Sequence, residues 1–223
     1  MEYVFDFSSI WGYRAQLVDG IVGTIVLAAV GTVLGVAVGI FGALARTWQL
    51  PVWSQLYAGY VELIRNTPFI VQLFFMFFGL PSLGVQINEW QAAALAMVIN
   101  LGAYSTEIIR AGMQAVPKGH LEAAQALAMS RLQIFFHVVL RQALLKVWPA
   151  LSSQIVIVML GSSVCSQIST QELTFAANFI QSRNFRAFEI YFIATGLYFL
   201  LALGLRQLLA LFARRVLLAR RIA

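Results

Sequence analysis

Long apolar runs separated by short polar segments dominate the pattern of this chain. Charge-free runs cover residues 20–45, 66–88, 90–106, 147–171 and 190–205. A membrane span needs about 20 mostly apolar residues. The third and fifth runs are short, but Glu107 and Arg206 fall in last turns, from which their side chains can snorkel to the interface. The pattern therefore predicts five transmembrane helices in one all-α integral membrane domain over residues 1–223.

Composition supports a membrane protein, because 61% of the residues are hydrophobic and only 11% are charged. A single cysteine, Cys165, excludes an internal disulfide, and we expect it to be a small buried apolar side chain. The acidic residues Glu2, Asp6 and Asp19 occupy a region where a secretory signal would be basic, so we expect no cleaved signal.

The distribution of Lys and Arg between the loops is strongly asymmetric and predicts an orientation. Cytoplasmic loops carry the excess of Lys and Arg, so the segment 1–19 is expected outside, and the loop 114–147 and the basic tail 207–223 inside. The net charge of +6 then reflects topology and not a nucleic-acid partner. The residues expected inside are Arg46, Lys118, Arg131, Arg141, Lys146, Arg214, Arg215, Arg220 and Arg221, and those expected outside are Arg14, Arg183 and Arg186.

Small residues form one face of the first predicted span. Gly31, Gly35 and Gly39 recur at a spacing of four, which lets another helix approach closely. This spacing favours packing within the chain over a dimer seam.

Two segments place a carboxylate three residues before an arginine on one helix face. The pairs are Glu62 with Arg65 and Glu107 with Arg110. Each pair either joins helix ends or takes part in gating, since charges at membrane depth need a partner or a cavity. Pro68 removes a backbone donor and disfavours helical geometry at Thr67, which predicts a break or kink in the second span.

The segment 122–149 is basic, rich in alanine and too polar for lipid, which suggests a cytoplasmic surface for a soluble partner. After a turn at Pro117 and Gly119, a helix with low-relief alanines is expected, and then a second helix along the inner surface that turns into the fourth span near Pro149. The two histidines, His120 and His137, have no metal-site spacing. No phosphate loop or hydrolase motif is visible, so we expect no catalytic site, metal or cofactor on this chain.

Several stretches resemble one family of transport proteins. "EAAQALAMS" after "AVPKGHL" is similar to the EAA loop of ABC importer permeases, and "YVELIRNTPFIVQLFFMFFGLP" resembles their polar amino-acid uptake subfamily. "INLGAYSTEIIRAGMQAVPKGHLEAA" and "FRAFEIY" extend the resemblance from about Gly20 to Arg215.

The resemblance implies a type I importer fold in a bacterial cytoplasmic (inner) membrane. It implies a second permease subunit, identical or not, a pair of cytoplasmic ATPase subunits that hold ATP and Mg, and an external or periplasmic substrate-binding protein. The EAA helix would be the coupling helix against the ATPase. Its contact residues would be Gly119, Glu122, Ala123, Ala124 and Ala128.

The sequence departs from the family pattern at three places. Ala128 stands where the family usually has glycine, and Arg141 follows "VVL" where the family has proline, so we expect a straighter helix there. Leu160 and Gly161 stand where many relatives carry a lysine and an acidic or polar residue, which leaves the fourth span uncharged.

The resemblance also implies a substrate path of polar, uncharged side chains. Gln154 replaces a glutamate of relatives that carry cationic amino acids, which favours a neutral or acidic polar amino acid. Alternatively, a non-identical partner permease holds the only substrate site. An ion-coupled secondary transporter is disfavoured because no inverted repeat or mid-membrane ionisable residue is visible, and a scaffold, a sensor or a membrane enzyme finds no support. The path residues implied are Asn100, Tyr104, Gln154, Ser162 and Ser163.

Overall fold

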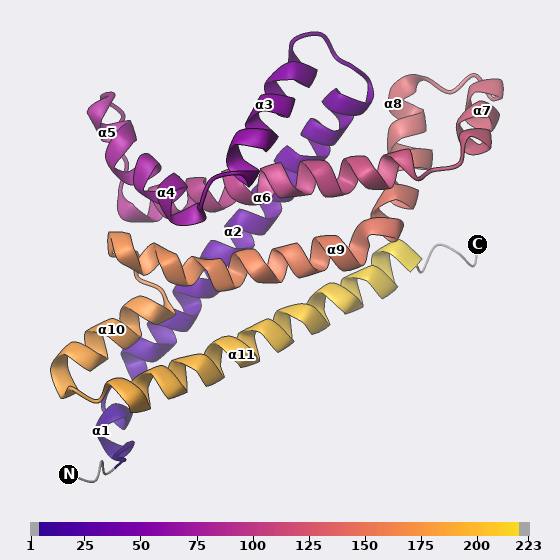
Figure 1. Ribbon diagram of the computed structural model, residues 1–223. Coiled ribbons are helices and arrows are strands. Elements are labelled where there is room, and N and C mark those ends of the chain that lie inside the picture. The colour runs from indigo at the N-terminus through magenta and orange to yellow at the C-terminus, as the bar shows by residue number, and fades with distance from the viewer. Residues whose placement is uncertain (1–4, 219–223) are drawn as a thin grey trace.

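The computed structural model describes residues 5–218, and this part of the chain is built of helices without a strand. Figure 1 shows the long helices lying side by side, with the short ones gathered at their ends. The α-helices are α1 (Ser8–Trp11), α2 (Arg14–Thr47), α3 (Trp53–Arg65), α4 (Phe69–Phe74), α5 (Leu80–Ser82), α6 (Glu89–Gln114), α7 (Lys118–Ala126), α8 (Arg131–Gln133), α9 (Leu140–Gly161), α10 (Leu173–Asn184) and α11 (Ala187–Phe212). The other turns are the π-helices η1 (Phe75–Gly79), η2 (Ile134–Val139) and η4 (Ala213–Leu218) and the 3-10 helix η3 (Ser162–Ile168).

Four helical stretches are long and apolar enough to cross a membrane, namely residues 14–47, 89–114, 131–168 and 187–217. A fifth crossing arises if α3 and the stretch 69–82 form one span, bent by 113°. In Figure 1, α2 and α6 run in the same direction along the molecule, and the bent pair carries the chain back between them. The predicted second span is therefore a broken one.

Pro68 determines the break between α3 and α4. It is the extended N-cap residue of α4, and it cannot donate a backbone hydrogen bond to α3. The last carbonyls of α3 are satisfied locally instead, because Asn66 Nδ2 donates to Glu62 O at 2.8 Å and Thr67 Oγ1 donates to Leu63 O at 2.9 Å. The break predicted from "RNTP" is confirmed.

The glycine face of α2 packs against α6 inside the same chain. A Cβ added at Gly31 would lie 3.2 Å from Met97 Cβ, and one at Gly39 would lie 2.3 Å from Ser105 Cβ. Gly35 is placed in the same way against Leu101, at 2.9 Å. Since the two rows share a spacing of four, they form one continuous seam, and the predicted intramolecular packing is confirmed.

The turn into the fourth span lies earlier than predicted. Pro149 lies inside α9, and Figure 1 shows the chain changing direction between α8 and α9 instead. A π-helix, η2, occupies this place, and the extra residue of a π-turn bends a helix without proline. Our expectations of a turn near Pro149 and of a helix straightened by Arg141 were both wrong.

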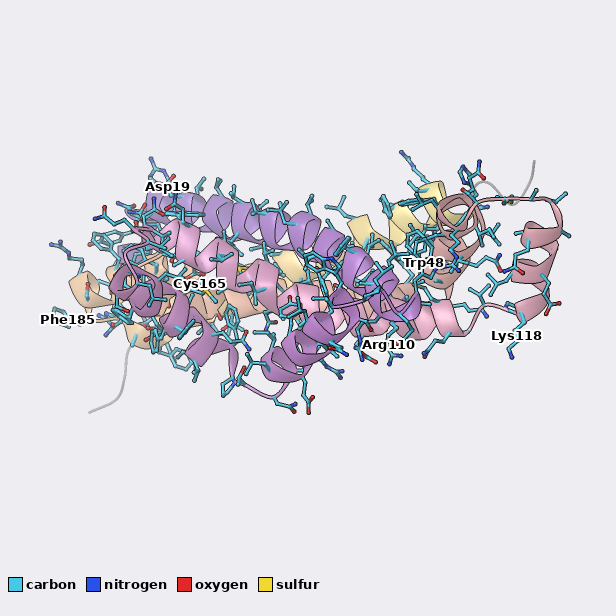
Figure 2. All side chains as sticks on the ribbon, turned by 90° about the horizontal axis from the view of Figure 1, so that it is seen from above. Asp19, Trp48, Arg110, Lys118, Cys165 and Phe185 are labelled. Carbon is cyan, nitrogen blue, oxygen red and sulfur yellow. The ribbon has the colours of Figure 1, made fainter. Side chains whose placement is uncertain are left out.

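The molecule is elongated and has two distinct ends. Figure 2 shows Asp19, Cys165 and Phe185 toward one end, and Trp48 and Lys118 toward the other. Cys165 belongs to an apolar core cluster and is fully buried, as predicted. The predicted tail continues α11 as a helix as far as residue 218, and its Arg220 and Arg221, like Glu2, lie outside the described residues.

Candidate functional site

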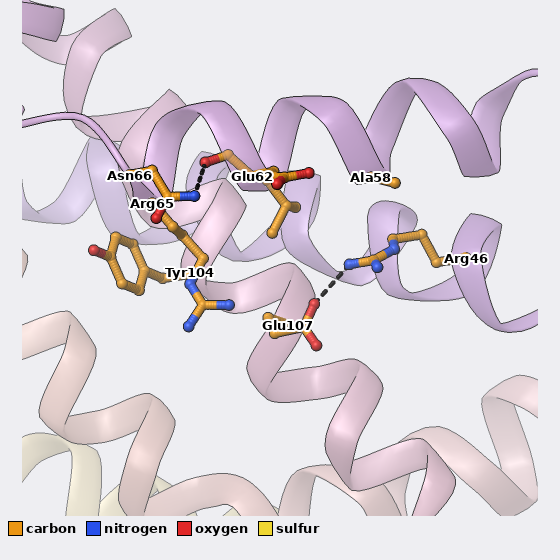
Figure 3. Close-up of a pocket in the computed structure, with 8 residues that line it drawn as sticks. Arg46, Ala58, Glu62, Arg65, Asn66, Tyr104 and Glu107 are labelled. Atoms are coloured by element: carbon orange, nitrogen blue, oxygen red, sulfur yellow. Dashed lines mark hydrogen bonds and ion pairs between the residues drawn. The ribbon is translucent and has the colours of Figure 1, made fainter.

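A polar cavity of about 430 Å³ opens between the end of α2, the last turns of α3 and the second half of α6 (Figure 3). It lies directly beside the break between α3 and α4. Two carboxylates and two guanidinium groups line it, together with one aromatic ring. The lining residues are Arg46, Ala58, Val61, Glu62, Arg65, Asn66, Tyr104 and Glu107.

Glu107 is the electrostatic centre of one wall. Its Oε2 accepts a hydrogen bond from Arg46 Nη1 at 2.6 Å, and its Oε1 accepts one from Arg110 Nη2. The predicted pair of Glu107 with Arg110 is confirmed. Sequence reasoning missed the role of Arg46, which is 61 residues away on α2. The carboxylate is thus shared by two cations and has little capacity left for a cationic ligand.

The predicted pair of Glu62 with Arg65 does not form among the described residues. The Arg65 guanidinium carbon lies 5.5 Å from the centroid of the Tyr104 ring on α6 instead. A cation over a ring face can compete with an exposed ion pair, which contributes little in water. Both charges are consequently available inside the cavity.

The cavity suits a zwitterion of modest size. Arg65 can bind a carboxylate in a bidentate manner, and Glu62 can accept hydrogen bonds from an ammonium group. Figure 3 shows the Arg65 guanidinium between Tyr104 and Glu107, and Glu62 on the α3 side. An α-amino acid carries both complementary charges on one carbon.

Of the five residues implied for the substrate path, only Tyr104 lines this cavity. Ser162 Oγ donates to Met159 O at 2.6 Å and Ser163 Oγ to Leu160 O at 2.8 Å, so both hydroxyls bond to their own helix. Gln154 is half-buried on α9 and makes no hydrogen bond in the described chain. Asn100 Nδ2 donates to Gln72 Oε1 at 3.0 Å.

Gln72 is a structural residue that sequence reasoning missed. Its Nε2 donates to Ile64 O at 2.8 Å and to Thr67 O and Oγ1 at 3.0 and 2.9 Å. The side chain is buried, and it ties the broken span to Asn100 on α6. A lone amide in an apolar run, four residues after Pro68, was the available signal. The break that borders the cavity is therefore held from both sides.

The predicted coupling helix, α7, protrudes at the end opposite Asp19 and Phe185 (Figure 2). Gly119, Glu122, Ala123 and Ala128 are exposed, as a docking surface requires. Ala124 is the exception, since it is only 4% exposed and packs in the cluster that contains Phe135 of η2. The contact role expected for Ala124 is therefore corrected: its buried side chain packs α7 against its own subunit.

Comparison with known proteins places this arrangement in a family. The family described as "Binding-protein-dependent transport system inner membrane component" matches residues 31–218. The chain belongs to this family. It is a transport subunit of the membrane and not an enzyme.

Individual relatives of this permease cover nearly its whole length. It is 33% identical over 214 residues to the glutamine transport system permease protein GlnP of Escherichia coli strain K12, covering 95% of this chain and 98% of that one. It is 33% identical over 201 residues to the L-cystine transport system permease protein TcyB of Bacillus subtilis strain 168, covering 90% of this chain and 86% of that one.

Solved structures share the fold of the permease. The crystal structure of an amino acid ABC transporter with histidines matches with a TM-score of 0.85 and 36% identity, over 96% of this chain and 100% of that one. An inward-facing MetNI methionine ABC transporter matches with a TM-score of 0.70 and 18% identity, over 92% and 98% of the two chains. The type I ABC importer fold is therefore confirmed.

Ala128 has a backbone conformation that explains the usual glycine of the family at this position. Its φ is +54°, in the left-handed region that a Cβ disfavours by about 1–2 kcal/mol. The residue ends the turn after α7, where Met129 N donates to Ala124 O at 3.2 Å. The permease keeps the turn without the glycine.

A buried carboxylate at the opposite end of the permease fixes α10. Glu172 Oε1 accepts from Phe175 N at 2.8 Å as the N-cap of α10, and Oε2 accepts from the Tyr198 hydroxyl of α11. Burial raises the pKa of the Glu172 carboxyl. Thr24 Oγ1 accepts from Leu173 N at 3.2 Å and adds α2 to the junction. Among the described residues, no group of three or more His, Cys, Asp or Glu side chains could hold a metal ion.

Proposed function

We propose that this permease forms half of the translocation path of an ATP-driven importer and carries a polar amino acid. The cavity beside the broken second span is the observation that carries the proposal, because it offers a guanidinium, a carboxylate and an aromatic face to a zwitterion. The relatives named for glutamine and cystine transport support the same substrate class.

The charges in the cavity favour a neutral or acidic side chain over a cationic one. Glu107 is already shared by Arg46 and Arg110, so Glu62 is the carboxylate left for the ammonium group of a substrate. A guanidinium or ammonium side chain would then lack a counter-charge, which is costly at membrane depth. Gln154, which is uncharged, agrees with this preference. The remaining alternative is that a non-identical partner permease holds the substrate.

Membership of the family supports the partners that we propose. A cytoplasmic ATPase pair, which holds ATP and Mg, would dock on the exposed face of α7, and a binding protein would deliver substrate at the other end. We place α7 and the C-terminus in the cytoplasm of a bacterial inner membrane and the N-terminus outside. A second copy of this chain or a related permease would complete the path.

The substrate proposal is tested with Arg65→Gln in the complete transporter, reconstituted in proteoliposomes with its binding protein. We expect uptake of the preferred amino acid to fall more than about tenfold, because a charge-assisted bond to the carboxylate is lost. Arg214→Gln is the matched control, since it removes the same charge from η4, which does not line the cavity. Wild-type uptake by Arg65→Gln would reject the cavity as the substrate site.

The proposed preference for neutral or acidic substrates, and the part of Gln154 in it, is tested in the same assay with neutral, acidic and cationic amino acids. Gln154→Glu should lower uptake of neutral or acidic substrates relative to cationic ones, because it adds an unpaired charge. Gln154→Ala separates charge from shape. If both variants keep the wild-type order of substrates, Gln154 does not border the path.

Docking on α7 is tested with Glu122→Lys and Ala123→Trp, which change exposed positions only. Both should lower binding-protein-stimulated ATP hydrolysis and uptake, whereas Gly196→Leu inside α11, away from both ends, should not. Orientation is tested with Gln125→Cys and Ser182→Cys in a Cys165→Ala background. An impermeant thiol reagent should label the cysteine at 182 in intact cells and not the one at 125.

A further inference from the structure

A second cavity with polar side chains, of about 490 Å³, lies between α9 and α11. The two helices meet beside it, where Trp148 Nε1 donates to Leu209 O at 3.2 Å and the Trp148 ring stacks on Phe212 with centroids 5.2 Å apart. The cavity is lined by Trp148, Pro149, Ser152, Ser153, Val156, Ile157, Arg206 and Ala210.

Arg206 is the only charged side chain in this cavity, and it forms no ion pair or hydrogen bond within residues 5–218. Neither wall can supply a counter-ion, because the sequence has no Asp or Glu at residues 123–171 or 190–223. The same two segments contain Arg141, Lys146 and Arg214 in addition. Nothing in the described part of the chain neutralises Arg206, so this cation can attract an anionic group of another molecule at the membrane border.

The serines of α9 offer donors to the same anion. Ser152 Oγ is buried and makes no hydrogen bond in the described part of the chain, although a buried hydroxyl normally has a partner. Ser153 follows it and is exposed along the cavity. A guanidinium and two hydroxyl donors are well suited to the oxygen atoms of a phosphate group.

The polar and apolar lining residues of this cavity also lie at different heights along the helices. Arg206 lies about 28 Å from the start of α11 at 1.5 Å per residue, so it lies near the far border of a hydrocarbon core about 30 Å thick. On α9, Trp148 lies one turn before the serines, and Val156 and Ile157 lie one turn after them, where Ile157 is 58% exposed. Donors at the border and an exposed apolar surface below them match the shape of a lipid.

We infer that this cavity binds an anionic phospholipid, with its phosphate at Arg206, Ser152 and Ser153 and an acyl chain along Val156 and Ile157. An anionic headgroup is favoured over a zwitterionic one, because the ammonium of a zwitterionic lipid would lie close to Arg206, whose charge has no counter-ion within residues 5–218. The lipid site is separate from the proposed substrate cavity, because the two share no lining residue.

The test uses the complete transporter, purified in detergent and stripped of lipid, with phosphatidylglycerol or phosphatidylcholine added back. Native mass spectrometry then counts the lipids bound per complex. Wild type should prefer phosphatidylglycerol, and Arg206→Gln should lower this preference about tenfold, as expected for one charge-assisted interaction. Arg214→Gln is the control, because Arg214 does not line the cavity. Ser152→Ala should lower the retention of phosphatidylglycerol, because one donor to the phosphate is lost, and keeps the test open if Arg206→Gln fails to fold; unchanged retention in this variant would count against the site.

Three outcomes would overturn the inference. The first is equal retention of phosphatidylglycerol by wild type and Arg206→Gln. The second is equal thermal stabilisation by inorganic phosphate and by phosphatidylglycerol, which would indicate a site for free anions. The third is crosslinking of a cysteine at 206 to the partner permease in a Cys165→Ala background, which would show that a protein subunit covers the cavity.

Discussion

Helices α6 and α11 are both 26 residues long, yet they differ sharply in their surroundings. In the apolar window of α6, 61% of the residues are buried inside the subunit, against 17% in the stretch that contains α11. The more buried helix is also the less apolar of the two. This order is the reverse of that in a water-soluble protein.

The contrast shows what places a helix in the middle of a membrane subunit. Lipid tails are as apolar as leucine, so hydrophobicity does not draw one helix onto another. Helix α6 buries small or polar residues such as Ala96, Ala103 and Thr106, whose hydroxyl donates to Gly102 O at 2.8 Å, whereas α11 exposes Phe199 and Leu200. Close backbone approach and satisfied polar groups decide which helix is central, and bulk apolar surface faces lipid.

The largest effect is expected from a substitution that breaks the seam between α6 and α2. Gly39→Leu inserts a side chain where even a Cβ would lie 2.3 Å from Ser105, so we expect a loss of stability of more than about 3 kcal/mol. Gly196→Leu on α11 is the matched control, because a Cβ there has nothing within 4 Å. Fluorescence-detected size exclusion should show aggregation of the first variant and a normal peak of the second. A normal peak for both would refute the seam as the reason for the central position of α6.

The next effect comes from removing the Glu107 charge in the second half of α6. Glu107→Gln leaves Arg46 and Arg110 without their shared carboxylate, and we expect a loss of about 2 kcal/mol, seen as a lower midpoint of thermal unfolding in detergent. Glu62→Gln should change the midpoint little, because Glu62 is exposed and has no ion pair among the described residues. A double-mutant cycle with Arg46→Gln should give a coupling energy clearly above zero. Equal effects of the two glutamine variants would argue against the Glu107 network.

A smaller effect concerns the contact of α11 with α9. Trp148→Phe keeps an aromatic ring against Phe212 but removes the hydrogen bond to Leu209 O, which predicts a loss of about 1 kcal/mol. Trp53→Phe is the control, since Trp53 is 51% exposed and donates no side-chain hydrogen bond in the described chain. Thermal unfolding should separate the two variants. A larger loss than for Glu107→Gln would mean that α11 is held as firmly as α6.

The smallest effect lies in the turn that follows α6 and α7. Ala128→Gly should stabilise the protein by about 0.5–1 kcal/mol, because glycine adopts a φ of +54° without a steric penalty. Ala126→Gly, in the helical last turn of α7, should destabilise it by a similar amount. The two midpoints of thermal unfolding should therefore move in opposite directions. Movement in the same direction would contradict the left-handed conformation.

The sequence by itself determined the features that depend on neighbours a few residues apart. The apolar runs, the glycine spacing of α2, the break at Pro68 and the pair of Glu107 with Arg110 follow from backbone chemistry and helical periodicity, which act within one or two turns. Family resemblance added the fold and the exposed position of most of α7.

Only the tertiary structure decided which surfaces meet. Arg46 reaches Glu107 across 61 residues, Arg65 turns from Glu62 to Tyr104, and Ala124 faces inward. The rotation of each helix about its axis and the angle at which helices cross set these contacts, and local periodicity specifies neither. For the same reason, only Tyr104 of the five polar residues implied for the substrate path lines the polar cavity, although each lies on a predicted helix.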